Sequence, residues 1–503
     1  MSRPTTGRWI CFRSALLIVL LLPLGCSDSR LADGTAGAAA EEEDPWLRLK
    51  RVATWTGDLD GMAERGFLRL LTVRSPTYYF VDGARERGLI AEFAPALESF
   101  LNRRLEPEGG RIRVIIIPVR RDRLLPALVE GLGDVAAANI TVTEERSKLV
   151  DFTAPTFTDA RELVVTGPAG PALSGLEDLS GQAVWVRESS SYNESLRALN
   201  SSLKAAGLEE IDIRSADENL EDEDLLEMVN AGLLPATVMD AHKLDALWDR
   251  IFEDIVVHRE IPLTDRGRIA AAIRKDSPLL GQALNEFLET RNLGSEFANV
   301  LVNRYMRSDR WIRNATATSE RRKYEAVADL FVTYGEQYAL DPLMLIAQGY
   351  QESGLDQSTR SPAGAVGVMQ LLPSTAAAPP VSIANIDEAE ANIHAGIKYL
   401  RHIVDEYFDD PGIDPVNRLL FAFAAYNVGP NRMARLRELA PQYDADPTEW
   451  FGEVERVVES RVGMEPVTYV ANIYKYYLAY KQLQERAVER DSAAADLEMK
   501  PDS

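Results

Sequence analysis

A glutamate at the end of an apolar segment is the residue of this chain whose setting best suits acid catalysis. Glu352 lies in residues 347–355, which read AQGYQESGL. Asp341 is a favourable N-cap, Pro342 a favourable first helical residue, and Gly354 is typical of the position just after a helix. Glu352 therefore falls in the last turn, where the helix dipole disfavours a carboxylate. A carboxyl group that stays protonated near neutral pH can act as a general acid.

An isolated glutamate at a helix end is more often a solvated surface residue, so the motifs downstream decide the interpretation. Residues 364–370 read GAVGVMQ, with two glycines three apart that permit close backbone approach. Residues 425–427 read AYN at the end of an apolar run, and Glu465 stands four residues before Tyr469. The AYN segment alone would be interpreted as the end of a helix. Together with Glu352, the glycine-containing segment and the Glu465–Tyr469 pair, it forms an ordered set of four motifs.

The four pieces, in this order, resemble the soluble lytic transglycosylases, a lysozyme-like family. The resemblance implies cleavage of the MurNAc-(β1,4)-GlcNAc bond of peptidoglycan without water, which leaves 1,6-anhydromuramyl ends. It implies that Glu352 acts first as the acid and then as the base. The implied substrate-binding residues are Ser353, Met369, Gln370, Tyr426, Asn427, Glu465 and Tyr469. Where the family reads Glu-Thr-Arg, this chain reads EPV at 465–467, so no arginine role is carried over.

Two other functions stay open from the residues. A lysozyme-like muramidase would share Glu352 but would normally need a second carboxylate, and the one close in sequence, Asp356, is interpreted as solvated or as a cap. A non-catalytic cell-wall ligand-binding lipoprotein would explain the first half of the chain alone. No metal or cofactor is expected, because no two histidines have the spacing of a zinc helix and no dinucleotide fingerprint is present; the histidines are His242, His258, His394 and His402.

The elements that must position these motifs are helical. Residues 321–486 show helical periodicity with short loops, which predicts an all-α domain. The predicted helices are 321–339, 342–353, 386–408, 416–426 and 469–486.

The preceding residues alternate between strand and helix patterns, which predicts an α/β architecture. Strands are predicted at 68–73, 113–119, 162–165 and 183–186, and a helix at 89–105. The pattern of Leu128, Gly131 and Asp134 before a short apolar run recurs as Val229, Gly232 and Pro235. Two similar lobes would leave a cleft between them for a small ligand.

This α/β region resembles the periplasmic solute-binding proteins of the amino-acid type. The matching residues are Gly88 with Glu92-Phe93, the triad Leu128, Gly131 and Asp134, the run TVTEER at 141–146, and Asp151-Phe152-Thr153. The resemblance implies that Arg146 binds the carboxylate of a muropeptide or amino-acid ligand, as a bidentate guanidinium can. It implies that Asp240 binds the amino group and that Thr141 adds a hydroxyl contact. The alternative for Arg146 is a surface ion pair with Glu144 or Glu145.

The N-terminus has the features of a targeting segment. Three arginines precede an apolar run at 14–25 that is too short to span a bilayer, and Cys26 follows at once. This resembles a bacterial lipoprotein signal, which implies a lipidated Cys26 and peripheral attachment to the periplasmic face of the outer membrane. Ordinary signal cleavage near this point is the alternative.

The length, charge and cysteine content of the chain limit its possible domain organisation and its possible partners. The chain has 503 residues, so several domains are expected, and its net charge of −23 argues against binding nucleic acid. Its two cysteines, Cys11 and Cys26, leave the mature chain without a disulfide. The predicted order is a signal peptide at 1–25, a tether at 26–62, a solute-binding-like domain at 63–292, a linker at 293–320, a catalytic domain at 321–486 and a disordered tail at 487–503.

Overall fold

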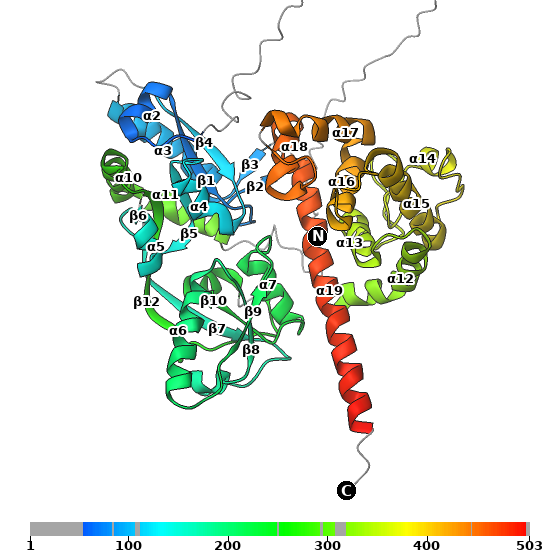
Figure 1. The fold of residues 1–503 in the computed structure, drawn as a ribbon, viewed down its shortest axis with the longest axis horizontal. Coiled ribbons are helices and arrows are strands. Elements are labelled where there is room, and N and C mark those ends of the chain that lie inside the picture. Colours follow the sequence, from blue (N-terminus) through cyan, green and yellow to red (C-terminus); the bar gives the residue numbers. More distant parts are fainter. Residues whose placement is uncertain are drawn as a thin grey trace, which may run out of the picture. The chain divides into compact units, whose positions relative to one another are not determined.

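The computed structural model describes residues 54–82, 85–105, 111–248, 251–291, 295–306, 318–443 and 445–498. The predicted signal peptide, Cys26 and most of the predicted tether lie outside these residues. An α/β domain is followed by a helical domain (Figure 1), which confirms the predicted fold class. None of the helices in the described part of the chain combines the length and the apolarity that a bilayer crossing requires.

The α/β domain is built on one sheet with the strand order β4-β1-β5-β12-β7-β10-β8-β9. In the first lobe, β1 (Phe67–Thr72) pairs in parallel with β4 (Arg113–Pro118) and β5 (Val135–Thr141). In the second lobe, β8 (Ala183–Arg187) pairs in parallel with β9 (Asp212–Ala216) and β10 (Ala236–Asp240). The long antiparallel strands β7 (Phe157–Thr166) and β12 (Thr264–Arg274) join the two halves. The sheet is therefore two parallel half-sheets joined by a shared antiparallel pair, as the two-lobed prediction requires.

The repeated sequence pattern marks the same turn in both lobes. In the first lobe α4 (Leu124–Val129) ends before Gly131, whose φ is +79°, and β5 follows. In the second lobe α7 (Asp222–Asn230) ends before Gly232, whose φ is +70°, and β10 follows. Both glycines adopt the left-handed conformation that other residues avoid, which explains why glycine recurs there.

The remaining helices of this domain cover the two lobes. The longest, α3 (Leu89–Leu105), has its predicted bounds and buries residues at helical spacing, among them Ile90, Ala94, Leu97 and Leu101. The others are α2 (Leu59–Arg65), α5 (Glu144–Leu149), α6 (Ser191–Ala205), α8 (Ala241–Lys243), α10 (Pro278–Arg291) and α11 (Glu296–Leu301). Short helical turns are η2 (Arg121–Arg123), η3 (Leu176–Leu179), η4 (Leu244–Trp248) and η5 (Val302–Met306).

Short strands complete the α/β domain. A separate hairpin is formed by β2 (Phe80–Asp82) and β3 (Arg85–Arg87), while β6 (Val150–Phe152) pairs with β12 and β11 (Val256–Val257) with β7. None of these short strands was predicted, because two or three residues carry too little periodicity to be recognised.

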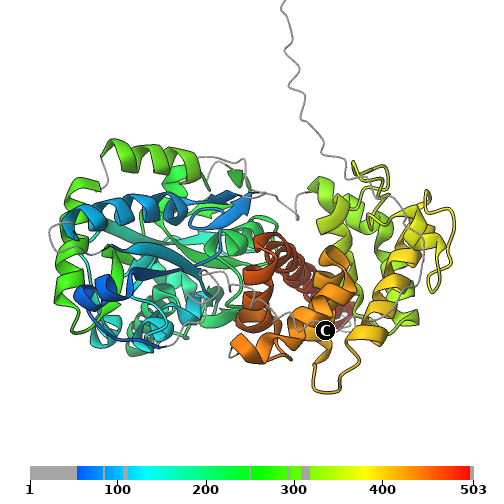
Figure 2. The same ribbon diagram turned by 90° about the horizontal axis from the view of Figure 1, so that it is seen from above.

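The helical domain is drawn as helices and loops in the yellow-green to red part of Figure 2. Its helices are α12 (Thr318–Gln337), α13 (Pro342–Ser353), α14 (Pro373–Ala377), α15 (Ala389–Tyr407), α16 (Pro415–Val428), α17 (Pro430–Glu438), α18 (Glu455–Arg461) and α19 (Met464–Glu498), with the short turns η7 (Ala440–Tyr443) and η8 (Trp450–Val454). Every residue from Leu419 to Ala425 of α16 is buried, so this helix forms the centre of the domain. The core also takes in the buried faces of α13, α15 and α19.

Two segments differ from the predicted organisation. The predicted linker 293–320 contains α11 and η5 before its undescribed part. The predicted tail begins at 487, yet α19 continues to Glu498. Alanines and glutamates in that stretch are strong helix formers, and this preference outweighs the polarity from which the tail was predicted.

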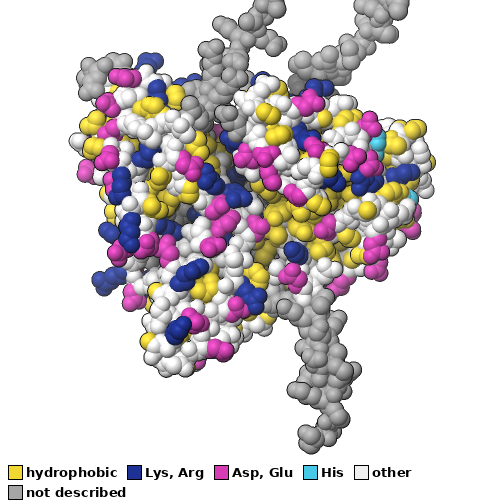
Figure 3. Space-filling model, in the orientation of Figure 1, with side chains coloured by type: hydrophobic (Ala, Val, Ile, Leu, Met, Phe, Trp, Pro, Cys, Tyr) yellow, Lys and Arg dark blue, Asp and Glu magenta, His cyan; other side chains and the backbone are white. Residues whose placement is uncertain are grey.

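The visible face in Figure 3 mixes acidic and basic side chains. Such a surface gives no broad basic area there for a polyanion, in keeping with the acidic composition.

Candidate active site

Helix α13 places Glu352 as the sequence predicts. The Asp341 carboxylate accepts hydrogen bonds from the backbone N–H groups of Leu343 and Met344, at 2.8 and 3.4 Å. Gly354 ends the helix with a φ of +66°. The helix between these caps is mostly buried, so the core of the domain holds its last turn, and with it Glu352, in place.

A tyrosine from the last helix binds the Glu352 carboxyl directly. The Tyr469 hydroxyl, on α19, donates a hydrogen bond to Glu352 Oε1 at 2.5 Å. The Gln348 amide, one turn before Glu352 on α13, donates to the Tyr469 hydroxyl oxygen at 3.2 Å. Gln348 is fully buried. The hydroxyl hydrogen of Tyr469 is therefore directed at the carboxyl by a residue of the same helix face.

The setting of Glu352 raises its pKa to about 7, because burial disfavours the carboxylate more than the Tyr469 hydrogen bond favours it. No carboxylate among the described residues contributes to this shift. A group with this pKa is present in both the acid and the base form near neutral pH, so it can donate a proton and later accept one.

The glycine-containing loop 364–370 is fixed against the end of α13 and against α15. The Ser353 hydroxyl donates to the carbonyl of Val368 at 3.0 Å. Asn392 of α15 accepts from the backbone N–H of Met369 at 2.8 Å and donates to the carbonyl of Val366 at 2.8 Å. Gly367 has a φ of +76°, and a Cβ there would lie 2.4 Å from the amide oxygen of Gln357. The loop therefore has one tightly held conformation.

Tyr426 connects this loop to α16. Its hydroxyl donates to the carbonyl of Met369 at 2.8 Å. Burial raises the pKa of Tyr426, and the charge of Glu352 raises it further. The side chain of Met369 is fully buried against Gly396, so it lies behind the loop and offers its carbonyl to Tyr426.

The other predicted substrate-binding residues lie at the edge of this cluster or outside it. Gln370 has a φ of +43°, and its amide donates to the carbonyls of Gly367 and Thr359 at 2.8 and 3.2 Å. Asn427 and Glu465 are exposed, at the last turn of α16 and the first turn of α19 respectively. The structure thus brings Glu352, Tyr469 and Tyr426 together, and Ser353 and Gln370 shape the loop beside them.

The Asp356 carboxylate, the second acidic group close to Glu352 in the sequence, is hydrogen-bonded to Ser358. Its Oδ1 accepts from the backbone N–H and the hydroxyl of Ser358, at 2.8 and 2.6 Å. These hydrogen bonds lower the pKa of Asp356, and the residue is exposed. It caps a turn, which is one of the two interpretations that the sequence allowed.

Two residues that hold this site were missed in the sequence. Gln348 precedes Glu352 by four positions, and its polar side chain in an otherwise apolar helix was a usable signal. Asn392 has no such signal, since its partners lie in the loop at 366–369 and only the fold brings them together.

The predicted ligand-binding residues of the α/β domain also converge. Thr141, Arg146 and Asp240 line one small cavity of about 50 Å³ between the lobes. The Arg146 guanidinium donates to the carbonyl of Ser189 at 2.8 Å and pairs with Glu194 at 3.3 Å. These partners come from the second lobe, so the ion pair is not the local one with Glu144 or Glu145 that the sequence left open.

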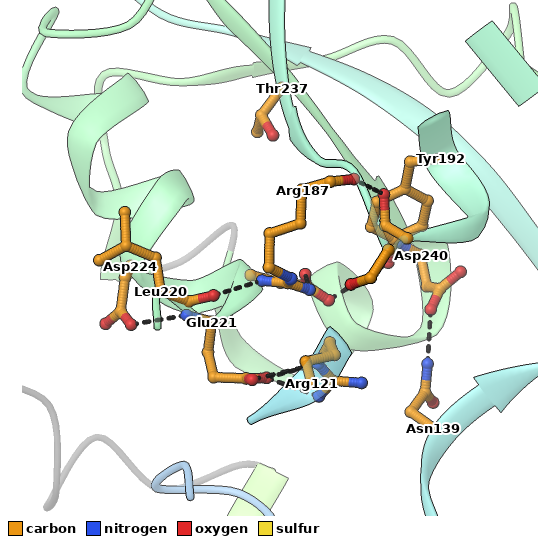
Figure 4. Close-up of polar contacts among 12 residues, drawn as sticks. Arg121, Asn139, Arg187, Tyr192, Leu220, Glu221, Asp224, Thr237 and Asp240 are labelled. Carbon is orange, nitrogen blue, oxygen red and sulfur yellow. Dashed lines mark hydrogen bonds and ion pairs between the residues drawn. The ribbon is translucent and has the colours of Figure 1, made fainter. Parts of the chain in front are cut away.

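Further contacts close the cleft between the lobes (Figure 4). The Asp240 carboxylate accepts from the Asn139 amide at 2.7 Å. Arg121 of the first lobe pairs with Glu221 of the second at 2.5 Å. Protein groups therefore occupy the Arg146 guanidinium and one oxygen of Asp240, while the buried Oδ1 of Asp240 has no hydrogen-bond partner in the described part of the chain.

Two segments of the chain match known protein families. Residues 74–308 match the bacterial extracellular solute-binding proteins, family 3. Residues 329–448 match the transglycosylase SLT domain, and this range contains Glu352, the loop 364–370 and Tyr426.

Curated relatives share both halves of the chain. A protein of Pseudomonas putida named membrane-bound lytic murein transglycosylase F is 28% identical over 437 residues, which is 83% of this chain and 86% of the relative. A protein of Alkalilimnicola ehrlichii named membrane-bound lytic murein transglycosylase F 1 is 28% identical, over 85% of this chain and 86% of the relative. The protein named membrane-bound lytic murein transglycosylase F in Desulfosudis oleivorans is 27% identical, over 87% of this chain and 96% of the relative.

Solved structures similar to the chain include an ancestral arginine-binding protein bound to arginine and a mutant of the arginine-binding protein of T. maritima. They are 24% and 21% identical, with TM-scores of 0.38 and 0.39. The matched regions cover 48% and 50% of this chain, and 98% and 99% of the chains of the two solved structures.

Proposed function

We infer that this chain belongs to the peptidoglycan lytic transglycosylases, because it joins a solute-binding domain to an SLT domain as its curated relatives do. The observation that carries the inference is Glu352: a half-buried carboxyl group whose pKa is about 7, held by the hydroxyl of Tyr469 at the end of α13. The substrate is the glycan strand of peptidoglycan.

The first half of the reaction uses Glu352 as an acid. Its proton passes to the glycosidic oxygen between MurNAc and GlcNAc as the bond from that oxygen to muramyl C1 breaks. The N-acetyl group of the substrate stabilises C1 as an oxazolinium, a substrate-assisted route that needs no second enzyme carboxylate. Tyr469 then stabilises the carboxylate that Glu352 becomes.

The second half uses Glu352 as a base. The carboxylate takes the proton of the muramyl C6 hydroxyl while the C6 oxygen forms a bond to C1 and the bond from C1 to the acetamido oxygen of the oxazolinium breaks. This step restores the N-acetyl group and returns Glu352 to its acid form. The product is a 1,6-anhydromuramyl end. Attack within the same sugar has the advantage of a high effective concentration over attack by water.

The supporting residues take separate roles. Tyr469 orients Glu352 and lowers its pKa through a hydrogen bond, Gln348 orients the Tyr469 hydroxyl, and Tyr426 fixes the loop through Met369. Gln370 and Ser353 hold the loop from either side, and the exposed side chains of Asn427 and Glu465 contact the glycan.

Release of soluble fragments from purified peptidoglycan tests this assignment. Glu352→Gln should lower the rate by about 10²-fold or more, as loss of a general acid does. Asp356→Asn is the matched control and should keep the activity, because Asp356 only caps a turn. Loss of activity in Asp356→Asn would favour a lysozyme-like hydrolase with two carboxylates. Unchanged activity in Glu352→Gln would refute the assignment of the acid.

The solute-binding domain takes an amino-acid or muropeptide ligand at Thr141, Arg146 and Asp240. This proposal is supported by their convergence on one cavity and requires the lobes to separate first, because Arg146 and Asp240 are now bound by Ser189, Glu194 and Asn139. Calorimetric titration with alanine and with a muramoyl tripeptide tests it. Arg146→Ala should abolish binding, and the exposed Arg214→Ala should not; binding that survives in Arg146→Ala would place the ligand elsewhere.

The chain is anchored at the periplasmic face of the outer membrane through a lipidated Cys26. The signal-like residues before Cys26 support this, and the relatives are named membrane-bound.

A further inference from the structure

The α/β domain contains a second cavity that is far larger than the cleft site. Its volume is about 490 Å³, compared with about 50 Å³ for the cavity at Arg146. Helices α3 and α10 and strands β5 and β12 contribute to its lining, with α11 and η5 beside them. A volume of this size falls within the range of small-molecule sites, about 300–1,000 Å³.

The wall of this cavity is apolar. Three phenylalanines, Phe93, Phe287 and Phe297, form a group in which the Phe93 and Phe287 rings meet edge to face at 4.9 Å between centroids. Aliphatic side chains of the flanking helices make up much of the rest. A ligand here would gain its affinity from burying apolar surface.

Three polar side chains in the wall, Asn139, Thr153 and Thr156, are already hydrogen-bonded within the protein. The Thr153 and Thr156 hydroxyls donate to the carbonyls of Ala154 and Ile269, at 3.0 and 3.2 Å. The Asn139 side chain is shared between Asp240 and His242, at 2.7 and 2.8 Å. These three side chains have little hydrogen-bonding capacity left for a ligand, whereas the buried Nδ1 of His242 in the lining has no hydrogen-bond partner among the described residues. An amino acid or a sugar carries several polar groups and would need more partners than this one atom provides.

One positive charge lies in the lining. Among the described residues that line the cavity, the ionised groups are Asp245 and Arg291. Asp245 pairs with Arg259 at 2.5 Å. Arg291 is the last residue of α10, and its guanidinium lies 5.0 Å from the centroid of the Phe297 ring. The cavity thus combines an apolar interior with a cation that suits an anionic head group.

We propose that this cavity binds a long-chain carboxylate, with the acyl chain among the phenylalanines and the carboxylate on Arg291. A ligand in an apolar cavity gains dispersion contacts with the side chains of its wall. An acyl chain supplies those contacts without requiring hydrogen bonds from the wall. The proposal is independent of the lytic activity and of the cleft ligand.

Fluorescence titration of the full chain with cis-parinaric acid tests the proposal, using the Cys26→Ser variant so that no attached lipid competes. One probe should bind per chain, and palmitate should displace it. Ala298→Trp, which places a ring in the cavity from α11, should weaken binding by at least about tenfold. Val300→Trp is the matched control, because Val300 is on the same helix, is 45% exposed and is not part of the lining.

Arg291→Gln tests the head group separately, because it removes the positive charge and leaves the apolar side chains of the cavity wall unchanged. It should weaken palmitate by at least about fivefold and leave hexadecanol unchanged. Absence of saturable binding, or equal binding by Ala298→Trp and Val300→Trp, would overturn the site. Equal loss of palmitate and hexadecanol in Arg291→Gln would overturn the assigned head group. Displacement of the probe by alanine would show that the cavity is not selective for apolar chains, and would also overturn the proposal.

Discussion

At the scale of the residue, the properties of Glu352 result from two opposing effects. Burial raises its pKa, and the hydrogen bond from Tyr469 lowers it, with a net value of about 7. The balance matters because one group has to act as acid and as base in turn. The same balance makes two predictions.

The first prediction concerns stability. The pKa of Glu352 in the folded chain, about 7, exceeds its ordinary value of 4.5. The folded state therefore holds this proton more tightly, and the stabilisation present below about pH 4.5 is lost as the pH rises through 7. Glu352→Gln removes this loss, so the variant should gain roughly 1–3 kcal/mol over the wild type between pH 4.5 and pH 8.5.

Denaturant unfolding at both pH values measures this gain. Asp356→Asn is the control: the pKa of Asp356 is lowered from 3.8, so its contribution to stability is lost only below that pH, and the difference between this variant and the wild type should be the same at both pH values. A difference between Glu352→Gln and the wild type that did not change with pH would contradict the prediction.

The second prediction concerns the pH dependence of activity. Tyr469→Phe removes the hydrogen bond that lowers the pKa of Glu352, so that pKa should rise. The alkaline limb of kcat/KM, where the acid form is lost, should move to higher pH. Tyr443→Phe, whose hydroxyl accepts from Arg461 at 2.6 Å, should leave the limb in place. A shift to lower pH in Tyr469→Phe would be incompatible with the assigned role of this hydroxyl.

At the scale of the element, the loop 364–370 owes its shape to glycines in two different settings. Gly364 and Gly367 both have positive φ, but only at Gly367 would a Cβ clash, 2.4 Å from the Gln357 amide. Gly364→Ala should therefore cost about 1 kcal/mol from backbone strain alone, and Gly367→Ala about 2 kcal/mol or more. Activity should fall with Gly367→Ala, because the loop holds Tyr426 through the carbonyl of Met369.

Urea unfolding and peptidoglycan release on the two alanine variants check this prediction together. Equal stability losses would mean that Gln357 moves aside freely. Full activity in Gly367→Ala would mean that the loop does not need its present shape.

The sequence was sufficient for elements whose signals are local. The bounds of α13 follow from Asp341, Pro342 and Gly354, and the structure has the same bounds. The contact between Tyr469 and Glu352 joins residues 117 positions apart, so no spacing rule could predict it, and only the family resemblance placed the two residues in one site. The partner of Arg146 was likewise decided by lobe closure rather than by local charges, since Glu194 lies on α6.

At the scale of the whole molecule, the chain combines a ligand-binding domain and a lytic domain behind a segment that resembles a lipoprotein signal. If Cys26 carries the lipid, then Cys26→Ala should move the protein from the membrane fraction to the soluble periplasmic fraction. Cell fractionation with immunoblotting measures this, and Cys11→Ala serves as the control because Cys11 lies before the predicted cleavage point. Membrane association that persisted in Cys26→Ala would exclude the lipid as the anchor.

The central claim is that Glu352 cleaves peptidoglycan by intramolecular transfer and not by hydrolysis. Mass spectrometry of the fragments released from purified peptidoglycan tests it most directly, with the wild type and Glu352→Gln side by side. We expect 1,6-anhydromuramyl ends from the wild type and none from Glu352→Gln. Reducing muramyl ends from the wild type would contradict it, because they would require a water molecule as the nucleophile.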